Sequence, residues 1–218
     1  GQDAGAAPLE QALATGRIRW PLAEYRRALS RLPDPLRQAL HTAHGAPEDD
    51  AAIEGGAFAF AAIRRGNALI ALQPERGQPA DREGEYHDTT RTPRHAYVAF
   101  YLWLQDQADA LVHIGAHGTL EWLPGKAAAL SPACWPQALT GALPVIYPFI
   151  VNDPGEAAQA RRRLGAVTLG HLPPPLAPSG TPAPFLRLER LLDEYSLADG
   201  MDAPRQARLV AAIRAEAQ

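Results

Sequence analysis

The chain has 218 residues, 46% of them hydrophobic, and a formal net charge of −3 at pH 7. This length suffices for one domain with a hydrophobic core, or for one domain and an appendage, and the weak negative charge offers no basic surface for nucleic acid. Cys134 is the only cysteine, which excludes an intrachain disulfide and a cysteine-based zinc site. No apolar run approaches the roughly 18 residues that span a bilayer, and no signal pattern opens the chain, so a cytoplasmic protein without membrane insertion is expected. Because the chain begins at Gly1 and not at Met, we expect a processed or excised chain.

Residues 1–50 are predicted to form an N-terminal helical segment, in which apolar residues recur at helical spacing between Pro21 and His44. A β-hairpin is predicted next, because the apolar runs 57–63 and 67–73 are separated by a turn-sized gap that contains glycine.

A long polar loop, residues 74–91, follows the hairpin and contains His87. Loops of this length inside a compact domain are usually functional or disordered. After it, Pro93 is placed to start a helix whose residues up to Leu104 present one apolar face. The short apolar run 110–114 then predicts a buried strand.

The second half of the chain continues the alternation of helices and strands. A short helix over 131–141 and a strand over 143–151 are predicted first. Asp153 is then placed as the N-cap of a helix, with Glu156 reaching back as the partner carboxylate of a capping box. A strand over 166–171 follows this helix.

The remaining residues divide into a linker and a helical pair. Residues 173–184 contain many prolines and predict a stiff linker, and residues 185–218 predict a C-terminal pair of helices.

The order of these elements predicts an α/β fold, with a mostly parallel sheet flanked by helices. Its strands are expected near 67–73, 110–114, 143–151 and 166–171, inside a core of residues 51–172. Parallel strands place their carboxyl ends at one edge of the sheet, where ligands bind in open α/β folds. We therefore expect the residues that follow these strands to converge on one cleft.

The most informative segment lies between His113 and Lys126, immediately after the strand 110–114. It holds two histidines, His113 and His117, together with Glu121, and its glycines argue against a helix. Apolar neighbours of Glu121 are expected to disfavour its charged form, which suits proton transfer near neutral pH. Lys126 is the only lysine among 21 basic residues, which indicates a position where a guanidinium cannot replace an ammonium.

Each of these residues also has an ordinary structural interpretation, and the pattern alone does not exclude it. His113 is equally consistent with a core histidine at a strand end, and Glu121 with an edge carboxylate paired with Lys126 or an arginine. The capped helix after Asp153 is equally consistent with a helix that binds nothing. The run Arg161–Arg163 is typical of a solvated helix end.

Two long motifs resemble a known family. HIGAHGTLEWLPGKAAALSPACWP (113–136) and LPVIYPFIVNDPGEAAQARRR (143–163) are similar to the large subunits of cobaltochelatases of the CobN type, and to the related H subunits of magnesium chelatases. The resemblance extends upstream through 64–77 and 86–104 and covers most of residues 50–172. Members of the family are several times longer than this chain.

The resemblance implies a multisubunit enzyme that inserts a metal ion into a tetrapyrrole. In the cobalt branch, Co²⁺ enters a corrin, hydrogenobyrinic acid a,c-diamide, on the aerobic route to cobalamin; in the other branch, Mg²⁺ enters a porphyrin. Separate AAA+-type partner subunits bind and hydrolyse ATP, which agrees with the absence of a phosphate-binding P-loop pattern from this sequence. Ala116 stands where the cobalt branch usually has Lys, and Ala157-Ala158 where it usually has Gly-Thr.

The resemblance and the chemistry of insertion together assign roles to the candidate residues. Pyrrolic protons must be removed, and neutral imidazole and carboxylate are ligands that suit Co²⁺. The expected catalytic residues are Glu121, His117 and Lys126, and the expected metal ligands are His113, His117 and Glu121. The expected substrate-binding residues are His87, Trp122, Asn152 and Glu156. The alternatives are a non-catalytic fragment for tetrapyrrole binding or assembly, and a magnesium-chelatase-H-like protein that acts on a porphyrin. The isolated chain is expected to be inactive.

Overall fold

The structure is a computed structural model that describes residues 11–13, 15–77, 88–115, 118–128, 130–148, 150, 153–170, 185–197 and 203–217. The chain divides into two compact units, Gly1–His171 and Leu172–Gln218. None of the helices among the described residues is long and apolar enough to cross a membrane.

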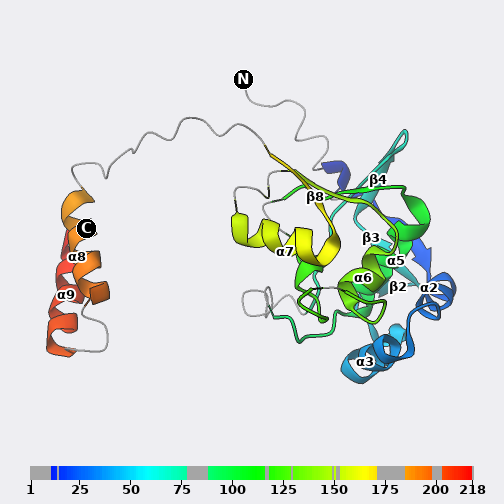
Figure 1. Cartoon of the computed structure of the whole chain (residues 1–218), viewed down its shortest axis with the longest axis horizontal. Coiled ribbons are helices and arrows are strands. Elements are labelled where there is room, and N and C mark those ends of the chain that lie inside the picture. Colours follow the sequence, from blue (N-terminus) through cyan, green and yellow to red (C-terminus); the bar gives the residue numbers. More distant parts are fainter. Residues whose placement is uncertain are drawn as a thin grey trace. The chain divides into compact units, whose positions relative to one another are not determined.

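The first unit mixes helices with short strands (Figure 1). Its strands are β1 (Ile18–Pro21), β2 (Ile53–Glu54), β3 (Ala57–Phe60), β4 (Ala62–Arg65), β5 (Ala68–Ala71), β6 (Leu111–Val112), β7 (Val145–Pro148) and β8 (Val167–Leu169). Its helices are α2 (Leu22–Leu29), α3 (Asp34–His44), α5 (His95–Gln107), α6 (Trp135–Thr140) and α7 (Pro154–Leu164), with 3₁₀ turns η1 (Pro47–Asp49) and η3 (Leu120–Trp122).

The parallel sheet that the sequence predicts is present, and the α/β fold class is confirmed. β6 pairs with β7 and β7 with β8, both in parallel, in the order β6-β7-β8. The crossovers contain α6 and α7, because parallel neighbours need a long connection, which is usually a helix. α7 is capped at its start by Asp153, whose side chain accepts from the Glu156 N–H, and it ends at Gly165 in the left-handed conformation.

The predicted strand at 67–73 is the exception, because it lies outside the parallel sheet. The part of it that forms a strand, β5, pairs antiparallel with β4 in a separate two-stranded hairpin. The hairpin itself is confirmed, but Gly66 and Asn67 form its turn, and Gly66 supplies the positive φ of +56°. The predicted strand 57–63 is broken at Ala61, so that β3 leaves the hairpin and pairs with β1 and β2.

Helix α5 forms the centre of the first unit. It lies between β3 and α6, and α2 also packs against it (Figure 1). The sequence predicts one apolar face, yet ten consecutive residues from His95 to Leu104 are buried. The helix also starts at His95, two residues later than predicted. Because neighbours surround it on all sides, its sequence is apolar throughout, not only on one stripe.

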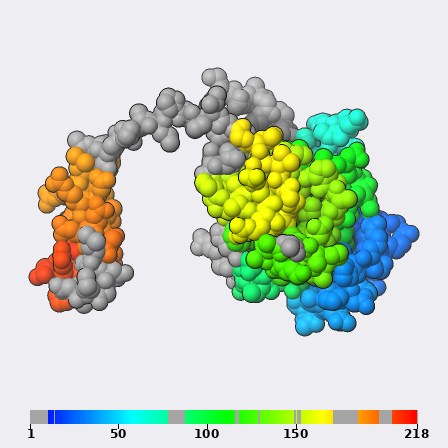
Figure 2. Space-filling view, in the orientation of Figure 1, coloured from blue at the N-terminus to red at the C-terminus, as the bar shows by residue number. Residues whose placement is uncertain are grey.

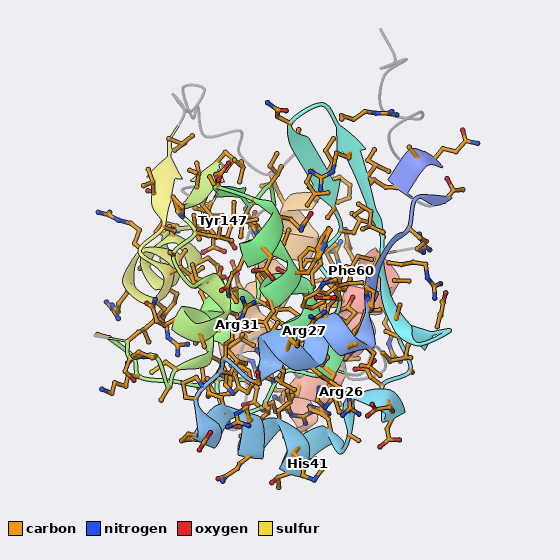
Figure 3. The ribbon with its side chains drawn as sticks, turned by 90° about the vertical axis from the view of Figure 1, so that its right-hand side faces the viewer. Arg26, Arg27, Arg31, His41, Phe60 and Tyr147 are labelled. Atoms are coloured by element: carbon orange, nitrogen blue, oxygen red, sulfur yellow. The ribbon has the colours of Figure 1, made fainter. Side chains whose placement is uncertain are left out.

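Two hydrophobic clusters fill this unit. The larger one joins α2, α3, β3 and α5, and the smaller one lies between β7 and α7. Figure 3 labels one member of each, Phe60 on β3 and Tyr147 on β7. Residues of the predicted N-terminal helical segment thus share a core with the central helix, through Tyr25 and Leu40 among others.

The second unit is the predicted helical pair, α8 (Leu186–Leu197) and α9 (Ala203–Glu216), which pack against each other. Arg187 pairs with Glu216 at 3.1 Å, and Leu209 is buried between the helices. The predicted linker at 173–184 lies outside the described residues.

Candidate functional site

The candidate site lies beyond the carboxyl ends of β6 and β7. The two strands pair in register, Leu111 with Val145 and Val112 with Ile146, and the His113 N–H donates to the Ile146 carbonyl at 2.9 Å. The chain leaves β6 at this point and reaches η3 through Gly118 and Thr119. This is the edge at which open parallel sheets bind ligands, so the predicted position of the site agrees with the fold.

Glu121 is the centre of the site and has no exposed surface. Its Oε1 accepts the Gly118 N–H at 3.3 Å, and the Tyr147 hydroxyl donates to Oε1 at 3.1 Å and to Oε2 at 3.3 Å. Burial raises the pKa of this carboxyl group, the nearby carboxylate of Glu156 adds to the rise, and the hydrogen bonds oppose it. The sequence-based expectation that the charged form is disfavoured is confirmed, and an exposed edge carboxylate is excluded.

Tyr147 connects Glu121 to His113. The rings of His113 and Tyr147 lie 4.5 Å apart at an angle of 33°, so the half-buried imidazole covers the phenol. A Cβ atom on Gly118 would lie 2.3 Å from the Tyr147 hydroxyl and 3.0 Å from His113 Nε2. Only glycine fits between these two side chains without displacing one of them.

Trp122 and Glu156 form a second contact beside Glu121. The indole N–H donates to Glu156 Oε2 at 2.7 Å, and Glu156 is 8% exposed. The sequence predicts that the Glu156 carboxylate reaches back to the Asp153 N–H, but that N–H donates to the Ile150 carbonyl at 3.0 Å. The carboxylate is thus directed at the site loop, because the Trp122 indole provides a short hydrogen bond there.

The arginine run at the end of α7 is not uniformly solvated, which corrects its sequence-based interpretation. Arg161 and Arg162 are exposed, whereas Arg163 is 3% exposed. Its guanidinium donates to the carbonyl oxygens of Glu121 at 2.6 Å, Leu123 at 2.9 Å and Lys126 at 3.2 Å. Glu156, Ala160 and Arg163 recur at helical spacing along the buried face of α7.

The segment after β5 also reaches the site, although β5 belongs to another sheet. The Gln73 amide donates to Thr119 Oγ1 at 2.8 Å, and the Tyr97 hydroxyl bonds the same oxygen at 2.9 Å. Tyr101 donates to Gln73 Oε1 at 2.7 Å. Arg76 donates to the Trp122 carbonyl at 3.4 Å. These contacts bring residues 73–76 beside the loop without any help from parallel strand pairing.

Lys126 lies apart from the carboxylates. Its side chain is exposed, and its backbone N–H donates to Sγ of the buried Cys134 at 3.4 Å. His87, His117 and Asn152 lie outside the described residues.

No group of three His, Cys, Asp or Glu side chains capable of holding a metal ion occurs in the described part of the chain. One of the three expected ligands, His117, falls outside that part, so the ligand set of His113, His117 and Glu121 stays a prediction.

α7 borders the loop and forms surface beside α6 (Figure 2).

Sequence reasoning missed Tyr147, Arg76 and Arg163 as members of the site. In the sequence, Tyr147 is indistinguishable from the other residues of its predicted strand. Only the folded structure shows that its hydroxyl donates to Glu121. For Arg163 a signal existed, namely its spacing of seven residues from Glu156 on one helix. No comparable signal marks Arg76, which reaches the loop from the segment after β5.

Comparison with known proteins shows the family of this chain. The model of the CobN/Magnesium Chelatase family matches residues 2–218. The chain is 48% identical over 188 residues to the aerobic cobaltochelatase subunit CobN of Pseudomonas aeruginosa, a match that covers 85% of this chain and 15% of the relative. It is 41% identical over 156 residues to the magnesium-chelatase H subunit of Cereibacter sphaeroides, a match that covers 70% of this chain and 13% of the relative.

A solved structure supports the same grouping. The catalytic subunit of cobaltochelatase from Mycobacterium tuberculosis superimposes with a TM-score of 0.70 at 37% identity, over 95% of this chain and 19% of that chain. The chain spans about 15% of the length of the curated Pseudomonas relative. The range matched by the family model includes the loop that holds Glu121, and the chain belongs to the CobN/magnesium chelatase family.

Proposed function

We propose that this chain acts as part of the large subunit of an ATP-dependent metal chelatase that inserts Co²⁺ into a corrin ring, hydrogenobyrinic acid a,c-diamide. Separate AAA+-type partner subunits bind and hydrolyse ATP in this proposal. The higher identity to the cobaltochelatase relative, 48% against 41% for the magnesium-chelatase relative, supports the cobalt branch. The product would serve aerobic cobalamin synthesis in the cytoplasm.

The observation that carries the proposal is the environment of Glu121. Metal insertion releases two pyrrolic protons, and a group that accepts them must bind protons near neutral pH. Burial raises the pKa of Glu121 toward that range, while Tyr147 and Gly118 hold its oxygens in place. Glu121 and the Tyr147 hydroxyl that donates to it are both fully buried, so bulk water does not compete for these hydrogen bonds.

The remaining residues take supporting roles. His113, His117 and Glu121 hand over the incoming metal, because imidazole and carboxylate suit Co²⁺. His117 and Lys126 complete the catalytic set. His87, Trp122, Asn152 and Glu156 hold the polar side groups of the ring, a role that the location of Trp122 and Glu156 beside Glu121 supports.

Glu121→Gln in the full-length subunit, assayed with its ATPase partners, tests this function. A glutamine oxygen still accepts from Gly118 and Tyr147 at the Oε1 position, so folding and ring affinity are expected to stay near wild type. The insertion rate is expected to fall about 10²-fold or more, the usual effect of losing an acid–base group. Glu54→Gln, at an exposed position on β2, is the matched control. An unchanged rate would remove Glu121 from the mechanism and transfer the role to His117.

A second candidate function is the binding of a tetrapyrrole or a partner without turnover. We expect the isolated chain to show neither ATPase nor insertion activity. Separate titrations with a corrin and with a porphyrin, each followed by assays with Co²⁺ or Mg²⁺ and the partner subunits, distinguish the fragment from the enzyme and the two branches from each other.

A further inference from the structure

The buried charged residues of the first unit are concentrated at one place. Apart from His95, four acidic or basic residues are buried among those the structure describes: Glu121, Glu156, Arg76 and Arg163, with exposures of 0%, 8%, 5% and 3%. Two are acidic and two are basic. All four are part of, or bond to, the loop of residues 121–126. Burying an ionisable side chain is costly unless it is hydrogen-bonded, so four buried side chains of this kind at one loop indicate a requirement specific to that loop.

The two arginines hold the backbone of this loop from different sides. Arg163, from the last turn of α7, donates to the carbonyls of Glu121, Leu123 and Lys126 at 2.6, 2.9 and 3.2 Å. Arg76, from the segment after β5, donates to the carbonyl of Trp122 at 3.4 Å. Four of the six carbonyls between Glu121 and Lys126 therefore accept from a buried guanidinium.

Arg76 also binds the segment that precedes α5. Its guanidinium also donates to the carbonyls of Asp88 at 2.6 Å and Arg91 at 3.1 Å, which lie at the start of the chain that leads to α5. The loop, the residues before α5 and the residues after β5 thus meet at one side chain.

Regular secondary structure does not fix this loop. η3 contains only three residues and is followed by bends and irregular backbone up to residue 128. Its backbone carbonyls have no strand partners, and a carbonyl that is buried requires a hydrogen-bond donor. A guanidinium offers five N–H donors in a rigid planar fork, whereas an ammonium is a single flexible donor atom. Arginine therefore suits a position that must reach three carbonyls at once.

We infer that Arg163 and Arg76 are positioning residues for Glu121, which act by fixing the loop backbone and not by touching the substrate. The inference rests on the proposed function of Glu121. Arg163 is 3% exposed, so it contacts no ligand directly, and its effect reaches the reaction through the carboxylate whose own carbonyl it holds.

The test uses Arg163→Lys in the full-length subunit with its ATPase partners. Lysine retains the charge but not the three-carbonyl contact, so the insertion kcat is expected to fall at least about tenfold, with KM for the ring within about twofold of wild type. Arg162→Lys, the exposed neighbour on α7, is the matched control and is expected to change neither. Arg76→Lys is expected to lower kcat by a smaller factor, because the bond described between Arg76 and the loop is longer, at 3.4 Å, than those of Arg163.

A double-mutant cycle separates positioning from a general loss of folded enzyme. If Arg163 acts through Glu121, Arg163→Lys has little further effect in the Glu121→Gln background. If it only supports folding, the rate falls by the same factor in both backgrounds, which would overturn the inference. If Glu121→Gln alone leaves the rate unchanged, the proposed function fails first, independently of the result for Arg163.

Amide hydrogen exchange provides a readout that needs no activity. Arg163→Lys is expected to raise exchange about tenfold or more in the loop after Glu121, while exchange in α5 stays unchanged. Unchanged exchange in the loop would overturn the inference even if the rate falls. Exchange raised equally in α5 and the loop would also overturn it, because that result indicates global destabilisation.

Discussion

Gly118→Ala tests the packing of the site in the isolated chain. The added methyl carbon would lie 2.3 Å from the Tyr147 hydroxyl and 2.7 Å from His113 Cε1, both far below a normal contact. Tyr147 is fully buried, so it cannot swing into solvent. To restore a contact of ordinary length, its hydroxyl must move by roughly 1 Å away from Gly118. Its hydrogen bonds to Glu121, now 3.1 and 3.3 Å, lengthen as it moves.

The expected loss of stability follows from these contacts. Overpacking by one methyl group costs about 1–3 kcal/mol, and a weakened buried hydrogen bond adds about 1 kcal/mol. The lower entropy of alanine in the unfolded chain offsets up to about 1 kcal/mol, since Gly118 does not have a positive φ that would strain it. A net loss of about 2 kcal/mol corresponds to a Tm lower by about 4–8 °C for a unit of this size.

Thermal unfolding followed by circular dichroism measures this effect. Gly170→Ala is the matched control, because a Cβ at that position meets nothing within 4 Å. Its Tm is expected to equal or slightly exceed that of the wild type. If the two variants unfold at the same temperature, then His113 and Tyr147 do not close over Gly118, and the described geometry of the site is refuted.

Two further predictions concern the buried carboxylates. Burial raises the pKa of Glu121, so the folded state binds this proton more tightly than the unfolded state does. The resulting stability is fully present below the ordinary carboxyl pKa of about 4 and is lost as the pH rises through the raised pKa. Glutamine does not titrate, so the Tm of Glu121→Gln relative to that of the wild type is expected to rise as the pH rises above about 4. A Tm difference independent of pH would contradict the burial of this group. Trp122→Phe removes the indole donor that Glu156 Oε2 accepts from at 2.7 Å, and should cost about 1.5–3 kcal/mol in denaturant unfolding. In the Glu156→Gln background the same change should cost less, and an equal cost would show that the two side chains are not coupled.

The place in the fold of the loop that holds Glu121 could be predicted, because it follows from the order of elements. A short apolar run that ends at Gly115 predicts β6, and alternation with helices predicts parallel neighbours. The carboxyl ends of β6 and β7 then share an edge, where Tyr147 of β7 donates to Glu121. The apolar neighbours of Glu121 also indicated its raised pKa correctly.

The partners of Glu121 could not be predicted from the sequence, because they depend on contacts between segments distant in sequence. Tyr147 is 26 residues away, and Arg163 holds the carbonyl of Glu121 across 42 residues. A basic run at a helix end has the same composition whether it is solvated or buried. Only the packing of α7 on the loop distinguishes Arg163 from its exposed neighbours.

The sequence by itself determined the α/β class, the three parallel strands, the capped helix α7 and the family, because local periodicity, capping residues and long motifs are properties of contiguous residues. Tertiary structure alone decided that β5 pairs outside the parallel sheet and that α5 is buried on every side. It also decided that four buried acidic and basic side chains meet at one loop. Distant segments compete for the same space and the same hydrogen bonds, and this competition decides which strands pair and where acidic and basic side chains are buried. A local sequence pattern does not contain that information.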